Sequence, residues 1–285
     1  MNEIIIEARE LSFEYPDGTP ALRDVSLKIR KGSKVAVLGS NGSGKSTLFM
    51  NFNGVLKPTG GRLFFKGREV GYSRSSLINL RKSVGIVFQD PDSQLFSASV
   101  LQEVSFGPVN LRMPQDTVKE RVDNALKELG IYNLRDRPVH FLSYGQKKMV
   151  TIADILVMEP ELIIFDEPTA CLDPKHTLNI IELFDRINQK GVTVIISTHD
   201  IDMAYSWADY IIVMKEGRIE MEGKPEDIFE DRRLLERAGL VKPVVLEIYR
   251  ELRRKGIIEE NLPVPRNKEK LLEMIKSIRK TGIVS

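Results

Sequence analysis

Residues Gly39–Thr47 have the sequence GSNGSGKST and directly follow the apolar run Val35–Leu38. From Gly39 through Ser46 the stretch matches the pattern G-x-x-x-x-G-K-[ST] of phosphate-binding loops. Glycines let backbone N–H groups turn toward phosphate oxygens, Lys45 reaches the β- and γ-phosphates, and Ser46 offers its hydroxyl to Mg²⁺. A flexible glycine loop is the alternative, but such a match arises by chance in only about one chain in a hundred. The stretch predicts a nucleotide site without separating a kinase from a GTPase or a motor ATPase.

Short β-branched runs recur on both sides of this loop and predict the strands of a buried, mostly parallel sheet. The predicted strands are Val35–Leu38, Val84–Phe88, Leu162–Phe165, Val192–Ser197 and Tyr210–Met214. Longer helical patterns separate them, as in a helix that starts after Asp173 and turns Ile180, Leu183, Phe184 and Ile187 toward the sheet. The fold class is therefore α/β, a P-loop NTPase.

The two ends and the middle of the chain depart from this alternation. Ile4–Ala8 and Leu22–Ile29 flank a Pro-Asp-Gly turn and predict an antiparallel layer, with residues 60–66 as a candidate further strand. Strand signals vanish between about Asp90 and Met158, where a helical insertion is expected. After Gly223 two helical patterns follow, with apolar residues at Val245, Ile248, Tyr249 and Leu252 and at Leu271, Met274, Ile275 and Ile278. We expect one large domain over residues 1–240, with a helical subdomain at about 90–160, and a helical domain over 241–285.

Composition narrows the class of protein. The 285 residues include 42 Lys and Arg against 40 Asp and Glu, a net charge of +2, which does not favour a nucleic-acid partner. The lone cysteine, Cys171, excludes an internal disulfide, and no secretory signal is evident. No apolar run approaches the roughly 20 residues that cross a bilayer. We expect a protein of the reducing cytoplasm whose membrane role, if any, comes through partner chains.

Polar residues end several of the predicted strands. Asp166 and Glu167 follow the strand Leu162–Phe165, and Asp166 can hold Mg²⁺ through water while Glu167 polarises the attacking water. Gln89 and His199 end two further strands, so Gln89 is placed to sense Mg²⁺ and water and His199 to bond the γ-phosphate. Taken singly, each residue is more often a strand-end turn or a structural side chain. Together they predict one phosphate site at the carboxyl edge of the sheet.

A second motif makes the pattern more specific. Residues Leu142–Gln146 have the sequence LSYGQ and open a helical stretch shortly before the Asp166 strand. With the order of the other motifs, this stretch resembles the signature of the ATP-binding-cassette family, usually spelled LSGGQ. The resemblance covers about Ile4–Leu240. It implies an ATPase in which Ser143 and the Gly145 backbone contact the γ-phosphate bound by an opposite subunit, so that hydrolysis requires a dimer.

The resemblance also implies roles for individual residues. It assigns catalysis to Glu167, His199, Lys45 and Gln89, and Mg²⁺ binding to Ser46, Gln89 and Asp166. It assigns ATP contacts to Tyr15, Gly39, Ser40, Asn41, Gly42, Ser43, Gly44, Lys45, Ser46, Thr47, Ser143, Gly145 and Gln146. Tyr15 would stack on adenine, for which a buried aromatic is the alternative, and Leu172 and Asp173 would form a loop that bridges the subunits.

The chain departs from the family pattern at two positions. Tyr144 stands where the signature usually has glycine, and its bulk lies beside a closely approached phosphate. Cys171 replaces a common serine before Leu172 and Asp173. We interpret Cys171 as a small interface residue and not a nucleophile, because no base for thiol chemistry is visible.

Within the family, Val84–Pro108 resembles the energy-coupling-factor importers of cobalt, nickel or vitamins, and cobalt-uptake ATPases carry very similar segments. The implied protein is a peripheral ATPase on the cytoplasmic face of the cell membrane. Its partners would be integral membrane subunits, with a second copy or a paralogous ATPase completing the dimer. In such systems residues 94–106 lie near the groove that receives a coupling helix of the membrane subunit.

Two other function classes stay open. Cassette ATPases that act on DNA, ribosomes or iron–sulfur assembly share these motifs without transporting anything. Those that repair DNA usually carry long coiled coils, and those of translation usually carry two cassettes. A small-molecule kinase is the other alternative, but it would leave the signature and His199 without a role. Copurification with a membrane subunit, or with ribosomes or DNA, discriminates between the first two classes.

Overall fold

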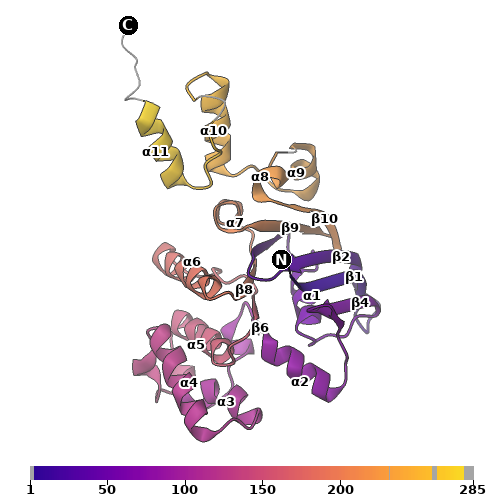
Figure 1. Cartoon of the computed structure of the whole chain (residues 1–285), viewed down its shortest axis with the longest axis vertical. Coiled ribbons are helices and arrows are strands. Elements are labelled where there is room, and N and C mark those ends of the chain that lie inside the picture. The colour runs from indigo at the N-terminus through magenta and orange to yellow at the C-terminus, as the bar shows by residue number, and fades with distance from the viewer. Residues whose placement is uncertain (1–2, 231, 259–261, 279–285) are drawn as a thin grey trace.

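The computed structural model describes residues 3–230, 232–258 and 262–278 and contains two sheets. The larger sheet has the order β10-β9-β3-β8-β7-β6 and the smaller one β2-β1-β4-β5. Figure 1 shows the larger sheet between the helical insertion (α3, α4, α5) and the smaller sheet, with α10 and α11 at one end. The predicted architecture is confirmed: an α/β fold with a mostly parallel sheet, an antiparallel layer, a helical insertion and a C-terminal helical extension.

The central sheet is parallel over β3, β6, β7, β8 and β9, and only β10 runs antiparallel to its neighbour. Its strands are β3 (Lys34–Leu38), β6 (Val84–Val87), β7 (Leu162–Phe165), β8 (Thr193–Ser197), β9 (Tyr210–Lys215) and β10 (Arg218–Gly223). Each predicted strand lies within one residue of its observed bounds. Successive side chains of β3 alternate between two hydrophobic clusters, Val35 and Val37 in one and Ala36 and Leu38 in the other. Both faces of this sheet are therefore buried, which accounts for its uninterrupted apolar strands.

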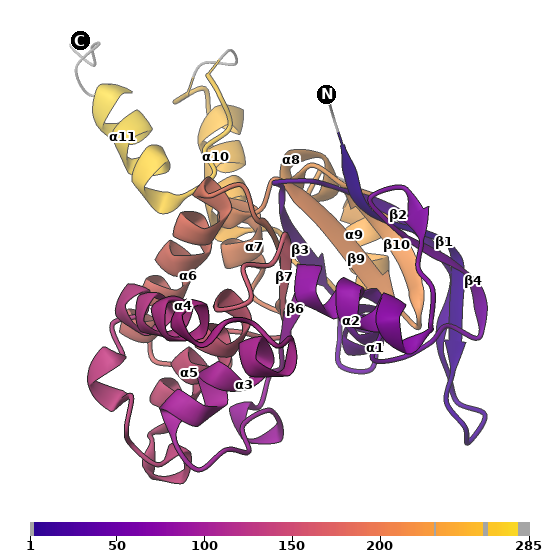
Figure 2. The same ribbon diagram turned by 60° about the horizontal axis from the view of Figure 1, so that its bottom comes forward.

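The smaller sheet packs on the same side of β3 as Val35 and Val37. It consists of β1 (Ile4–Glu14), β2 (Pro20–Arg30), β4 (Gly60–Phe65) and β5 (Arg68–Glu69). Strand β1 runs six residues past the predicted end at Ala8, because a register shift after Ala8, with Glu10 at φ 53°, restores the inward direction of Leu11 and Phe13. The sheet forms one wall over the loop that follows β3 (Figure 2).

Helices flank both faces of the central sheet and build the insertion. Helices α1 (Lys45–Phe52) and α2 (Arg74–Ser83) pack on the same side as the smaller sheet, and α6 (Pro174–Gln189) and α7 (Ile201–Trp207) cover the other face. The insertion contains η1 (Pro91–Ser93), α3 (Val100–Asn110), α4 (Gln115–Glu128), η2 (Tyr132–Leu134), η3 (Val139–Phe141) and α5 (Tyr144–Leu156). Helix α6 buries the four predicted apolar residues, and the Asp173 carboxylate caps it by accepting from the His176 N–H at 2.9 Å.

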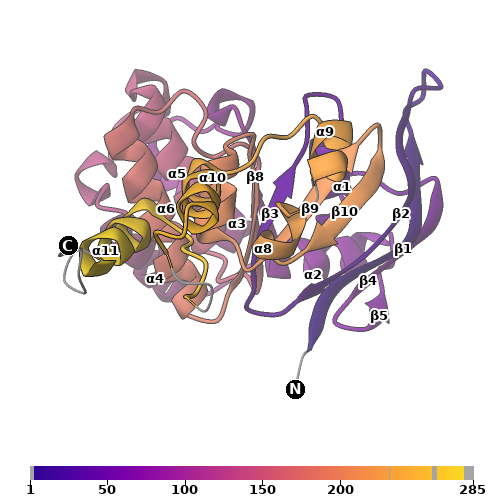
Figure 3. The ribbon, with the colours of Figure 1, turned by 90° about the horizontal axis from the view of Figure 1, so that it is seen from above.

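The C-terminal extension is made of helices, the first two of which lie beside β9 and β10 (Figure 3). They are α8 (Pro225–Ile228), α9 (Arg232–Ala238), α10 (Val244–Arg254) and α11 (Lys268–Ile278). The Arg266 guanidinium donates to the Tyr205 and Ala208 carbonyls at 2.7 and 2.5 Å, and the Val244 N–H donates to Asp202 at 2.8 Å. Helix α7 is thus the platform on which this extension rests.

The apolar stripe of α10 differs from the sequence expectation. Leu246 and Tyr249 are buried, whereas Ile248, which the periodicity grouped with Tyr249, is 44% exposed. Val245 and Leu252 also pack against the core, so the predicted stripe is confirmed except at Ile248, and it missed Leu246. The side chain of Ile278, expected on the stripe of α11, lies outside the described residues. Within the described residues no helix is both long and apolar enough to cross a bilayer.

Candidate functional site

The loop between β3 and α1 has a backbone that only glycine tolerates at two points. Gly39 has φ 154°, and a Cβ there would lie 2.4 Å from the Met214 carbonyl oxygen. Gly44 has φ 102° and lies directly before α1, where a Cβ would meet the Ala21 carbonyl oxygen at 2.7 Å. The loop therefore packs tightly against β9 and β2 while the N–H groups of the first turn of α1 are left for a ligand.

Two polar side chains in this loop, those of Ser43 and Lys45, could contact a bound anion. The Ser43 hydroxyl is buried and has no hydrogen-bond partner among the described residues. The Lys45 side chain, 6% exposed, folds back so that Nζ donates to the Gly39 carbonyl at 2.7 Å and the Ser40 carbonyl at 3.2 Å. An anion in the loop would give the hydroxyl a partner and exchange the lysine's carbonyl contacts for phosphate contacts. The loop therefore fits a triphosphate.

The two acids that follow β7 are held by one serine from the neighbouring strand. Asp166 and Glu167 are 5% and 8% exposed. The Ser197 hydroxyl donates to Asp166 Oδ1 at 2.5 Å and accepts from the Glu167 N–H at 2.7 Å. Glu167 has φ 45°, a left-handed conformation that is costly for a non-glycine residue and is often found at functional sites. Ser197 thus holds the Asp166 carboxylate and the Glu167 main chain.

His199 and Gln89 end the strands on either side of β7. His199 is largely exposed, with Nδ1 3.1 Å from Glu167 Oε2. Gln89 lies just beyond β6, and its side chain reaches the same cavity as the two acids. The structure therefore brings Lys45, Gln89, Asp166, Glu167 and His199 to one edge of the sheet, as the parallel topology predicted.

These elements enclose a cavity of about 470 Å³. Its walls are Tyr15, Thr19, Pro20, Ala21, Asn41, Gly42, Ser43, Gly44, Lys45, Ser46, Thr47, Gln89, Asp166 and Glu167. Tyr15 lies at its mouth, where its hydroxyl is 3.0 Å from the Thr47 hydroxyl and its ring packs edge-on against Phe13. Gly39, Ser40 and His199 line a neighbouring cavity of about 450 Å³ together with residues 236–240.

A magnesium ion is implied by the loop motif, and the donors present fit it. Ser46 supplies a hydroxyl, Asp166 a carboxylate and Gln89 an amide oxygen, all on the wall of one cavity. Such oxygen donors suit Mg²⁺, which is usually held by one or two carboxylates together with substrate phosphates. The described residues contain no cluster of three or more His, Cys, Asp or Glu arranged around a metal. The ion would therefore depend on the nucleotide for part of its coordination.

The signature residues lie apart from this cavity. Ser143 caps α5: its hydroxyl accepts from the Gln146 N–H at 3.4 Å, and the Gln146 side chain accepts from the Ser143 N–H at 3.0 Å. Ser143 is exposed, and Ser143, Gly145 and Gln146 are absent from the walls of the nucleotide cavity. Cys171 is also exposed. Within one protomer the cradle and the signature are thus separate.

Two buried residues at this site were missed by sequence reasoning. Ser197 ends an apolar strand, and its role depends on the strand beside it. Lys148 is 1% exposed on α5 and donates through Nζ to the Phe88 and Gln89 carbonyls, both at 2.9 Å. Burial lowers the pKa of Lys148 to about 8. For Lys148 the sequence offered one signal, a lysine two residues beyond the signature.

Comparison with known proteins gives consistent matches. The ABC transporter family profile matches residues 22–170. The energy-coupling factor transporter ATP-binding protein EcfA3 of Clostridium perfringens is 48% identical over 264 residues, 92% of this chain and 93% of the relative. EcfA of Methanocaldococcus jannaschii is 46% identical over 260 residues, covering 91% and 92% of the two chains.

Solved structures are similar over most of their length. The cbiO1 protein of Clostridium perfringens, described as part of the ABC transporter complex cbiONQ, superposes with a TM-score of 0.74 at 48% identity, covering 88% of this chain and 99% of that one. The ATP-binding cassette MJ0796, solved as a post-hydrolysis dimer bound to ADP and Pi, gives a TM-score of 0.71 at 28% identity, covering 78% and 99%.

Proposed function

This chain belongs to the ABC transporter family, and we propose that it is the ATP-hydrolysing subunit of an energy-coupling-factor type importer. It is an ATPase whose hydrolysis is coupled to transport. The names of the relatives support the importer type. For the cargo we propose cobalt, another transition metal ion or a vitamin, held by a different chain of the complex.

The observation that carries the proposal is the gathering of Lys45, Asp166 and Glu167 on the wall of one cavity. The loop N–H groups and Lys45 bind the β- and γ-phosphates and stabilise the charge that develops on them. Glu167, whose main chain is held by Ser197, orients the attacking water in line with the γ-phosphate. The exposed His199 contacts the Glu167 carboxylate and helps to hold it in place. Asp166, Ser46 and Gln89 would hold Mg²⁺, which when bound neutralises phosphate charge.

A second protomer completes the site in this proposal. The exposed Ser143 turn at the start of α5 offers a hydroxyl and helix N–H groups to an anion. Because that turn lies outside its own cavity, its natural ligand is the γ-phosphate held by a neighbour, with Leu172 and Asp173 bridging the pair. The neighbour is a second copy or a paralogous ATPase, as in the dimeric cassette of similar fold.

The membrane subunit would dock on the helical insertion. Phe96 and Phe106 are 66% and 48% exposed, and their rings meet edge-on with centroids 4.8 Å apart. This apolar pair lies in the segment that follows Gln89. A coupling helix bound there would therefore move when the nucleotide site changes shape. The protein would thereby be held at the cytoplasmic face of the cell membrane through its partners.

Glu167→Gln tests the assignment. It keeps the shape of the side chain but replaces one acceptor oxygen by an NH2 group and removes the negative charge, so ATP should still bind while turnover falls about a hundredfold or more. ATP titration and phosphate release measure the two effects, and unchanged hydrolysis contradicts the role of Glu167. Pull-down from detergent-solubilised membranes tests the transport role: an integral membrane subunit supports it, and ribosomes or DNA would favour a non-transport cassette.

A further inference from the structure

The first turn of α5 is fastened to the segment that follows β6. The Tyr144 hydroxyl donates to the Gln89 carbonyl at 3.1 Å. The buried Lys148, one turn further along the same helix, donates to the Gln89 and Phe88 carbonyls at 2.9 Å. The Gln89 carbonyl oxygen therefore accepts two bonds from α5, one of them from the residue next to Ser143.

A third contact widens this attachment. The Lys147 ammonium pairs with Asp92 Oδ1 at 2.5 Å, so three of the first five residues of α5 hold residues 88–92. The pair joins a carboxylate that is 60% exposed to a largely buried lysine that is 16% exposed, so water screens it on the Asp92 side. The uncharged bond from Tyr144 and the buried bonds from Lys148 therefore set the geometry.

Gln89 lies between the nucleotide cavity and the signature helix. Its side chain is on the wall of the nucleotide cavity with Lys45, Asp166 and Glu167, while its main-chain carbonyl is held by the signature helix. A shift of Gln89 on nucleotide binding would thus reach Tyr144 and, through one peptide bond, Ser143.

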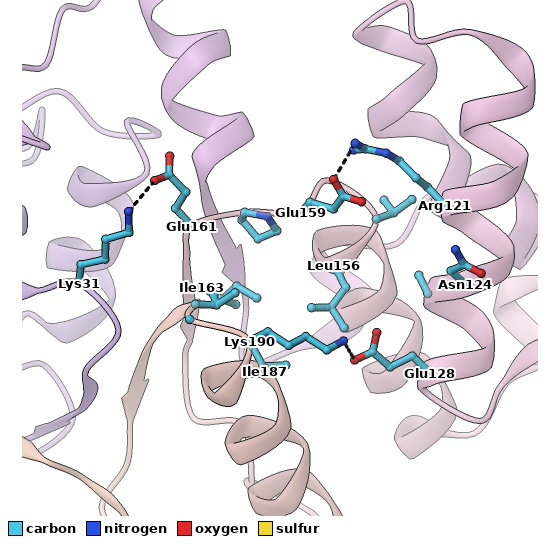
Figure 4. A pocket seen from close by; sticks show the side chains of 15 residues that line it. Lys31, Arg121, Asn124, Glu128, Leu156, Glu159, Glu161, Ile163, Ile187 and Lys190 are labelled. Atoms are coloured by element: carbon cyan, nitrogen blue, oxygen red, sulfur yellow. Dashed lines mark hydrogen bonds and ion pairs between the residues drawn. The ribbon is translucent and has the colours of Figure 1, made fainter.

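The opposite end of the same interface is loose. At the amino edge of the sheet a cavity of about 490 Å³ separates α4 from α6 and the start of β7, with Leu156, Ile163 and Ile187 on its walls (Figure 4). Two ion pairs span it: Arg121 with Glu159 at 2.6 Å and Lys190 with Glu128 at 2.5 Å, each with a largely exposed partner. The insertion can therefore tilt about this end while its other end follows Gln89.

We propose that Tyr144 is a positioning residue that couples the two nucleotide sites of a dimer. By holding the Gln89 carbonyl, its hydroxyl makes the Ser143 turn, which serves the neighbour's ATP, respond to the ATP in its own protomer. The inference rests on the proposed function and gives the glycine-to-tyrosine departure at this position a physical purpose. Burial raises the pKa of the Tyr144 hydroxyl, so the group stays protonated and remains a donor.

Tyr144→Phe in a Glu167→Gln background isolates the hydroxyl, because the ring and the helix start are kept. Three quantities are measured on the full chain: ATP affinity of the dilute protomer, protomer concentration at half-dimerisation in saturating Mg-ATP, and melting temperature without nucleotide. Tyr132→Phe is the matched control, since it removes a hydroxyl from the same insertion, where the Tyr132 ring stacks only beneath Lys127.

We expect ATP affinity and melting temperature to change little in Tyr144→Phe, while half-dimerisation requires on the order of twentyfold more protein, from about fivefold for each of two lost hydrogen bonds. The control should match its parent. A dimerisation midpoint within twofold of the parent overturns the proposal, and so does a parallel loss of ATP affinity and melting temperature, which marks a merely structural role. Failure of the Glu167→Gln parent itself to dimerise would instead overturn the proposed function together with this inference.

Discussion

The two halves of the nucleotide site are built in opposite ways. The cradle half is buried and fixed: Lys45, Asp166 and Glu167 are at most 8% exposed, and Ser197 holds both acids. The signature half is a capped helix start on the surface, with Ser143 exposed and held by its own turn. In the proposed dimer a protomer builds one wall of a site completely and offers the other to a neighbour, so we expect ATP binding to be local and hydrolysis to be shared.

The largest expected effect separates binding from turnover. Lys45→Ala removes the only ammonium on the cavity wall, so ATP affinity and hydrolysis should both fall about a hundredfold or more. Ser143→Arg places bulk and charge on the surface turn, so hydrolysis should fall by a similar factor while ATP affinity stays within about threefold. ATP titration and phosphate release check both variants. Equal loss of ATP affinity in the two variants would contradict the assignment of ATP binding to the cradle alone.

A smaller effect is expected from the serine behind the acids. Ser197→Ala leaves the Glu167 N–H and the Asp166 carboxylate each without a partner, so kcat should fall about tenfold and the melting temperature by a few degrees, with ATP affinity nearly unchanged. Steady-state kinetics and calorimetry measure these changes. Ser206→Ala on α7, which loses only a bond to the Met203 carbonyl, is the control. An unchanged kcat would show that the backbone alone positions Glu167.

The smallest expected effect concerns stability at the far end of the signature helix. One oxygen of Asp154 is buried without a hydrogen-bond partner among the described residues, and burial, together with Glu103, raises its pKa well above 3.8. Above about pH 4 the unfolded chain releases this proton while the folded chain keeps it, so stability falls as pH rises toward the folded pKa. Asp154→Asn, a neutral isostere, removes that loss. Its melting temperature should exceed that of the parent by more at pH 8 than at pH 5.

Asp116→Asn, on the exposed surface of α4, is the control for this measurement. A gain from Asp154→Asn that is the same at both pH values would show that Asp154 is already charged in the folded protein. The signature helix would then contain no buried acid whose protonation affects stability. The contrast between the fixed cradle and the signature helix would be correspondingly weaker.

The sequence predicted most of the sheet because buried parallel strands are short, apolar and bounded by polar residues, as Leu162–Phe165 is. It missed the full length of β1, where the alternation breaks at Glu10, and the buried edge of α10, where Leu246 and not Ile248 faces inward. Both errors arise from tertiary packing that local periodicity does not encode.

The same limit applies to the site. The loop, the acids and His199 follow from motifs, because each lies at the end of a strand whose neighbours are predictable. Ser197 and Tyr144 act across elements: one bonds residues of the next strand, the other the carbonyl of a residue 55 positions earlier in the chain. From sequence, Tyr144 predicted only bulk beside a phosphate. The roles assigned to individual site residues remain predictions until the variants are measured.

Mixing two inactive variants tests the shared site most directly. Lys45→Ala keeps an intact signature and Ser143→Arg an intact cradle, so a dimer of one with the other contains a single complete site. With two-fold symmetry and random pairing, an equimolar mixture should recover about a quarter of the wild-type hydrolysis rate although neither variant alone is active. Wild-type hydrolysis by solitary Ser143→Arg protomers, or a mixture that forms mixed dimers with ATP yet stays inactive, would contradict the account.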